Sequence, residues 1–166
     1  MVVYFSIYCF LGFIMESIYI SLLKRKWIAS GLLKGPFIPL YGFGATILIC
    51  IFSFLHCNIF FTCLIGGLAM TALEYFTSLY IEKVFHCECW NYSHHHFQIH
   101  GRICLFYTIM WSILSGFLIF TIHPFIIQLH MMNDFMTILS LIYLSFLLKA
   151  FINKIQFTKR NGLDIH

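Results

Sequence analysis

Long apolar runs, separated by short segments that hold every basic residue, are the feature that most constrains the fold of this chain. The ten Lys and Arg residues lie in three segments, 24–34, 83–102 and 149–160. The turn near His56 and the connection 123–134 contain none. Because basic residues are retained on the cytoplasmic side of a membrane, the pattern predicts a chain that crosses a membrane several times.

Composition indicates the same class of protein. The 166 residues are 61% hydrophobic and 10% charged, and their mean hydropathy is +0.89, which leaves too little polar surface to cover a soluble globule. Backbone groups in hydrocarbon need partners within their own segment. The apolar runs are far longer than the roughly 10 residues of a barrel strand. The predicted fold class is therefore all-α, a polytopic transmembrane helix bundle.

Five helices are predicted within a single transmembrane domain, residues 1–158, followed by a short polar cytoplasmic tail, residues 159–166. Each helix is close to the ~20 residues that a bilayer requires. With five crossings, the basic segments place the N-terminus outside and the C-terminus in the cytoplasm of a bacterial inner membrane. The predicted helices lie near residues 2–23, 37–55, 59–81, 103–122 and 135–151.

The net charge of +4 does not indicate a nucleic-acid partner. The basic residues flank apolar spans and form no separate polar domain, so we assign them to topology and to contacts with membrane lipids. No cofactor is predicted.

Two glutamates inside predicted spans are the strongest candidates for a functional site. Glu16 and Glu74 each lie about two turns before a cytoplasmic helix end. A carboxylate there costs roughly 2.5 kcal/mol or more, so both are expected to face the bundle or a polar cavity. Arg102, at the mouth of the fourth span, is long enough to reach one of them. Two interpretations stay open, a network that fixes packing and a substrate site.

The first four spans have the features of a duplicated hairpin. Gly35 and Gly101 each follow a cytoplasmic loop and are expected to place the start of the next helix, and Tyr41 and Tyr107 lie six residues beyond them. Pro36 suits a helix start, where its missing N–H would have been unpaired. A tandem duplication is one explanation, and chance similarity is the other.

The cytoplasmic loop after the third span contains sulfur and imidazole ligands. His86, Cys87 and Cys89 are weak candidates for a soft-metal site. The Cys-x-Cys spacing lacks a second pair of the kind that zinc sites use. The alternative is an interfacial loop in which Trp90 and Tyr92 are headgroup anchors.

Common enzyme signatures are missing from the sequence. It has no Gly-x-x-x-x-Gly-Lys phosphate loop and no Gly-x-Ser-x-Gly elbow. The chain is therefore not itself an ATPase. Catalysis on lipid by Glu, His and Arg at the cytoplasmic face stays open.

Five short pieces, 11–19, 31–44, 73–86, 90–93 and 101–105, occur in a specific combination and order. Through them the chain from about Phe10 to Pro124 resembles the bacterial membrane family described as "Putative ABC-transporter type IV". Asn91 departs from the family's usual aspartate. The positions that match the family's recurring residues are Glu16, Gly35, Pro36, Tyr41, Glu74, Glu82, Trp90 and Arg102.

The resemblance implies a permease-like membrane subunit that pairs with a separate ATPase or forms a homo-oligomer. It does not reveal a substrate. A non-transporting assembly or regulatory protein and a membrane-embedded enzyme acting on lipid are the alternatives. A permease predicts a cavity that reaches both glutamates, an assembly protein predicts a closed and fully paired cluster, and an enzyme predicts a cleft that opens to lipid.

Overall fold

The computed structural model describes residues 1–56, 58–129 and 133–163. Within them the regular secondary structure is helical apart from two short paired strands, which confirms the predicted all-α bundle. The elements are α1 (Val2–Lys24), α2 (Pro39–Leu55), α3 (Ile59–Phe85), β1 (Gln98–Ile99), β2 (Ile103–Cys104), α4 (Leu105–Phe117), the π-helical turn η1 (Leu118–Ile122), α5 (His123–Gln128) and α6 (Asp134–Leu163).

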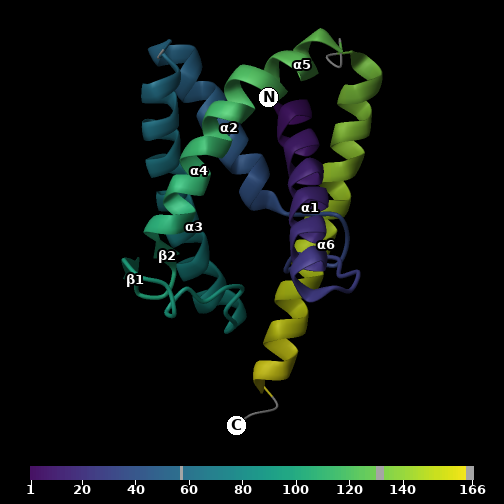
Figure 1. The fold of residues 1–166 in the computed structure, drawn as a ribbon. Coiled ribbons are helices and arrows are strands. Elements are labelled where there is room, and N and C mark those ends of the chain that lie inside the picture. The colour runs from purple at the N-terminus through teal and green to yellow at the C-terminus, as the bar shows by residue number, and fades with distance from the viewer. Residues whose placement is uncertain (57, 130–132, 164–166) are drawn as a thin grey trace.

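Four helical segments of the described chain are long and apolar enough to cross a membrane. The apolar helix α2 is shorter, with 17 residues and a length of about 25 Å. Successive segments alternate in direction (Figure 1), so the fold is that of a multi-pass membrane protein. The four long segments are Val2–Lys24, Ile59–Phe85, Leu105–Gln128 and Asp134–Arg160.

The two ends of the bundle differ in what they contain. The N-terminus, the α2–α3 turn and α5 lie at one end, and the loops 25–38 and 86–104 lie at the other (Figure 1). The last turns of α6 extend beyond the remaining helices at this second end, which we call the loop end. All three basic segments of the sequence are therefore at the loop end.

Three helices continue further than the sequence pattern predicted. α3 is capped by Asn58, whose side chain accepts a hydrogen bond from the Phe61 N–H, and runs from Ile59 to Phe85. The fourth span extends to Gln128 because a π-helical turn accommodates the chain before Pro124. α6 continues to Leu163, so the residues from 159 to 163 are helical where a polar tail was expected. The rest of that tail lies outside the described residues.

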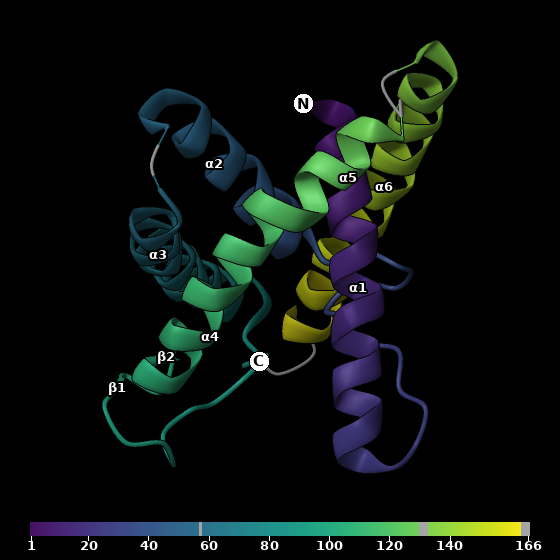
Figure 2. The same ribbon diagram turned by 45° about the horizontal axis from the view of Figure 1, so that its top comes forward.

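The bend at η1 carries α5 across the end of α1 (Figure 2). His123 joins the two helices, because its Nδ1 atom shares a 3.0 Å hydrogen bond with the Tyr8 hydroxyl and its ring lies 4.8 Å from that of Tyr4. Pro124 follows in the first turn of α5, where a missing N–H is tolerated.

Helix pairs α1–α2 and α3–α4 make the closest contacts, and small residues allow them. A Cβ atom added to Gly66 would overlap Ser115, and one added to Gly67 would overlap Ser112. Close approach at small residues is how helices associate in lipid. α6 lies along α1 and buries few of its side chains, so most of its apolar surface faces outward.

Candidate functional site

Glu74 is buried in the middle of α3, with 3% of its surface exposed. Its Oε1 atom accepts a 2.9 Å hydrogen bond from the Tyr92 hydroxyl, and its Oε2 atom accepts a 3.1 Å bond from the Trp111 indole N–H. Both carboxylate oxygens are thus paired within the protein. This arrangement offsets the cost of placing a carboxylate in the bundle.

Aromatic packing holds Tyr92 against Glu74. Its ring stacks on Tyr107 at 4.5 Å, and the Tyr107 hydroxyl shares a 3.2 Å hydrogen bond with the Tyr19 hydroxyl of α1. Burial and the adjacent Glu74 carboxylate raise the pKa of Tyr92, so its hydroxyl stays protonated as a donor. Tyr92 therefore links the loop 86–104 to the interior of the bundle.

Glu16 lies half-buried on α1 and faces the loop 25–38. Its Oε1 atom accepts a 2.6 Å hydrogen bond from the Ser30 hydroxyl. The Ser30 N–H in turn donates to the Ser17 hydroxyl at 3.0 Å, and the Ser21 hydroxyl binds the backbone of Ile28. Serines of α1 thus hold the loop against the helix, and Glu16 also accepts a hydrogen bond from the Tyr41 side chain.

The Tyr41 side chain lies between Glu16 and Glu74. It lies near enough to Glu16 and Glu74 to interact electrostatically with both, and its ring lies 5.7 Å from Trp111. The ring packs directly on Gly12, where any side chain would overlap it. The two carboxylates are therefore near one another, with a phenol between them.

Arg102 does not join this group. Its guanidinium forms an ion pair with Glu82 at the surface of the loop end and lies 6.0 Å from the Tyr75 ring. The predicted pairing of Arg102 with Glu16 or Glu74 is not formed. The physical reason is the turn before α4, which directs Arg102 toward the last turns of α3 and away from the bundle interior.

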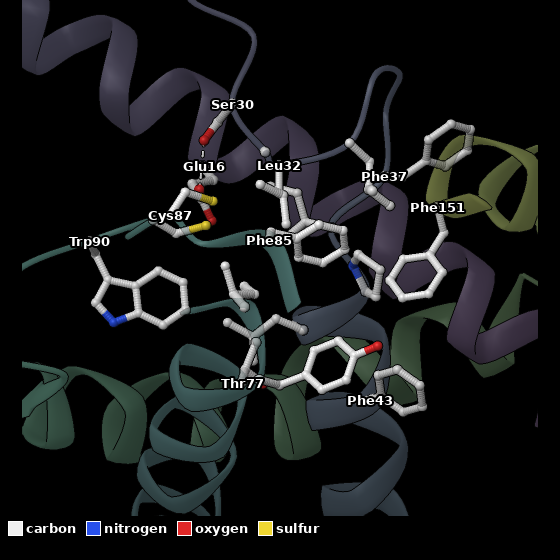
Figure 3. A pocket seen from close by; sticks show the side chains of 18 of the residues that line it. Glu16, Ser30, Leu32, Phe37, Phe43, Thr77, Phe85, Cys87, Trp90 and Phe151 are labelled. Carbon is white, nitrogen blue, oxygen red and sulfur yellow. Dashed lines mark hydrogen bonds between the residues drawn. The ribbon is translucent and has the colours of Figure 1, made fainter. Parts of the chain in front are cut away.

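A pocket of about 770 Å³ opens beside Glu16 at the loop end, and we call it the loop-side pocket. Its wall is formed by the loop 25–38, α2, α3, the start of the loop 86–104 and α6. Figure 3 shows Glu16 and Cys87 at one end and Phe37 and Phe151 at the other. The wall is mostly apolar, and Glu74 is not part of it. The cavity thus reaches one of the two glutamates.

The proposed metal ligands do not form a metal site in the part of the chain that the structure describes. No group of three or more His, Cys, Asp or Glu side chains there is placed to hold an ion. Cys87 and Cys89 line the loop-side pocket, whereas His86 is exposed at the end of α3. Partial burial, with Cys87 and Glu16 nearby, raises the pKa of Cys89 to about 11, which disfavours the thiolate that metals bind.

Gly35 and Gly101 occupy equivalent places in the two predicted helical hairpins. Gly35 has φ +120° and Gly101 has φ +68°, backbone conformations that favour glycine. Both α2 and α4 begin four residues after the glycine. The prediction that Pro36 starts the helix was wrong, because α2 begins at Pro39. Pro36 lies in the loop before it, and its carbonyl accepts a 2.7 Å hydrogen bond from the Tyr143 hydroxyl of α6. These equivalences agree with the predicted duplication.

Three partners of the glutamates were missed by sequence reasoning. Ser30, Tyr92 and Trp111 lie in a loop, in a second loop and in a span, and nothing in their spacing relates them to Glu16 or Glu74. Trp111 could have been identified from the sequence as a partner of a buried acid, because it lies inside an apolar span and a buried indole N–H needs an acceptor. Trp90 is also tied down, since its N–H donates to the Arg102 carbonyl at 2.9 Å.

Together, the helical bundle, the paired carboxylate and the adjacent pocket define a polytopic membrane protein with a polar centre near the loop end. The chain belongs to the family described as "Putative ABC-transporter type IV", whose family model matches residues 3–155. The match extends beyond the resemblance noted in the sequence and includes most of α6. Neither a curated protein nor a solved structure matches the chain with significant similarity.

Proposed function

We propose that this protein is a permease-like membrane subunit of a transporter and that the loop-side pocket binds its substrate. The observation that supports this most is the pocket itself. Its volume of about 770 Å³ is within the range of ligand pockets, roughly 300 to 1,000 Å³. A mostly apolar wall with a few polar groups, here including the carboxylates of Glu16 and Glu88, is a common form of such a site.

The chemistry of the wall suggests the class of substrate. Phe37, Phe85 and Phe151 offer apolar contacts, and Glu16 and Glu88 offer carboxylate groups. A molecule with an apolar body and a cationic or hydrogen-bond-donating group matches both features. The donor group would face Glu16, where a charge-assisted bond is strongest.

Orientation and partner are part of the same proposal. The loop end contains all ten basic residues, so it is assigned to the cytoplasm of a bacterial inner membrane, with the N-terminus outside. A pocket at the cytoplasmic end would be next to a separate ATPase subunit, which the family description suggests. A homo-oligomer would use the outward apolar face of α6.

The test is purification of the full chain in mild detergent, with mass spectrometry of retained small molecules and proteins. The wild-type chain should retain a small molecule that Glu16→Gln loses, because the substitution removes the charge from the pocket. Thr77→Trp should lose it as well, by filling the space. Glu82→Gln is the matched control, since Glu82 is a surface glutamate that does not line the pocket. Equal retention by all four chains would contradict the proposal.

A non-transporting assembly or regulatory protein is the second candidate, and the pairing of Glu74 favours it. Both Glu74 oxygens are used within the protein, and Arg102 is paired with Glu82, as a closed structural cluster requires. In that case the same proteins copurify with wild type, Glu16→Gln and Thr77→Trp, and no small molecule depends on the pocket.

A further inference from the structure

A second pocket lies at the loop end, between the loop 25–38 and the C-terminal half of α6. Its volume is about 690 Å³. Four basic side chains line it, and none of its lining residues is acidic: Lys34, Lys149, Lys154 and Arg160. We call it the basic pocket.

The periodicity of α6 produces this concentration of charge. Lys149, Asn153, Gln156 and Arg160 are spaced i, i+4, i+7 and i+11, so they share one face of the helix. Lys34 faces them from the loop. The pocket thus has a polar stripe on one wall and a basic side chain opposite.

The basic side chains have few counter-charges. Among the described residues, Arg102 and Glu82 form an ion pair, and neither residue lines the pocket. Lys154 has the Cys89 thiol nearby, a group that is neutral at ordinary pH. An uncompensated cluster of four positive charges attracts an anion.

Apolar side chains complete the wall. Phe146 and Phe157 of α6, with Leu32 and Phe37 of the loop, lie among the basic residues. A soluble anion uses only the charges, whereas a molecule with an anionic head and apolar tails uses both kinds of wall. The apolar residues therefore favour an amphipathic ligand.

The depth of the pocket agrees with such a ligand. Asn153 lies about 20 residues from the start of α6, which corresponds to about 30 Å along the helix. This equals the thickness of the hydrocarbon core. The basic pocket is thus at the level of lipid phosphates in the leaflet at the loop end.

We infer that the basic pocket binds the phosphate headgroup of an anionic phospholipid, with the acyl chains along Phe146. This site is separate from the loop-side pocket and does not depend on the proposed transport function. Leu32 and Phe37 line both pockets, so a short stretch of the loop forms their common wall.

The experiment uses native mass spectrometry of the full chain from nanodiscs of phosphatidylcholine with or without phosphatidylglycerol. The wild-type chain should retain phosphatidylglycerol in preference to phosphatidylcholine. Lys149→Gln with Arg160→Gln should reduce that retention by about tenfold or more, since each basic residue near a membrane surface contributes about a fivefold factor. Lys149→Arg with Arg160→Lys keeps the charge and should restore it.

A matched control separates the pocket from general charge. Lys24→Gln with Lys26→Gln removes the same charge at the same end but outside the pocket, and should leave retention within about twofold. A further arm adds inorganic phosphate to the wild-type chain in nanodiscs that contain phosphatidylglycerol. If phosphate displaces phosphatidylglycerol at millimolar concentration, or if both double variants lose lipid equally, the inference is overturned.

Discussion

The Tyr92 hydroxyl donates a 2.9 Å hydrogen bond to Glu74, a residue eighteen positions earlier in the chain. The bond connects the loop 86–104 to the interior of α3, and the Trp111 indole of α4 donates to the other carboxylate oxygen. A buried acid thus has partners from a loop and from a helix. Removing any one of the three groups leaves a buried polar atom unpaired.

Glu74→Gln should destabilise the protein. A glutamine offers one acceptor oxygen, so its amide NH₂ must face either the Tyr92 hydroxyl or the Trp111 N–H, and that donor loses its bond. The expected cost is about 1 to 3 kcal/mol, which lowers Tm by roughly 3 to 10 °C for a chain of this size. Thermal unfolding in detergent measures it. Glu88→Gln, at an exposed loop position, is the control and should leave Tm unchanged.

Glu82→Gln should have a much smaller effect. The side chains of Glu82 and Arg102 are 47% and 20% exposed, and solvent screens such a pair. A partly exposed ion pair contributes at most about 1 kcal/mol. A loss of Tm as large as that of Glu74→Gln would show that the pair is more important than its exposure indicates.

Gly12→Ala should separate α1 from α2, because the added methyl group would overlap the Tyr41 ring. Overpacking of this kind costs about 1 to 3 kcal/mol. Tyr41→Ala removes the obstacle, so the double variant should lose less stability than the sum of the two single variants. Strict additivity in the thermal unfolding of the three variants would argue against this contact.

How far the sequence predicted the site depends on the kind of contact. Helical periodicity and hydropathy are local, so the spans and the protein-lined placement of Glu74 followed from them. The partners Tyr92 and Ser30 are in loops, whose conformation depends on positive φ values and side-chain hydrogen bonds that no periodicity reports. The predicted pairing of Arg102 with Glu16 or Glu74 was wrong for the same reason, because the length of a side chain does not determine the direction in which the loop places it.

Cys89 should react slowly with maleimide. Its pKa is raised to about 11 from an ordinary 9.0, so the neutral thiol predominates below pH 11. At pH 7.5 the thiolate fraction is then about 100-fold smaller than for an unperturbed thiol. The labelling rate, followed by peptide mass spectrometry, should rise about tenfold per pH unit through pH 10. A plateau near pH 9 would contradict the raised pKa.

The proposed orientation predicts opposite accessibility for two cysteines introduced into a cysteine-free chain. Leu129→Cys, after α5, should react with a membrane-impermeant maleimide added to intact cells. Ser93→Cys, in the loop 86–104, should react only after the cells are permeabilised. The reverse pattern would place the basic segments outside and overturn the assignment.

The stretch of loop that contains Leu32 and Phe37 is a partition between two cavities. A ligand that displaces this partition from one side alters the free energy of binding on the other. Thermodynamic linkage makes that effect mutual and equal in size. The lipid composition of the bilayer would in this way change the affinity of the loop-side pocket for its ligand, without any direct contact between that ligand and the lipid in the basic pocket.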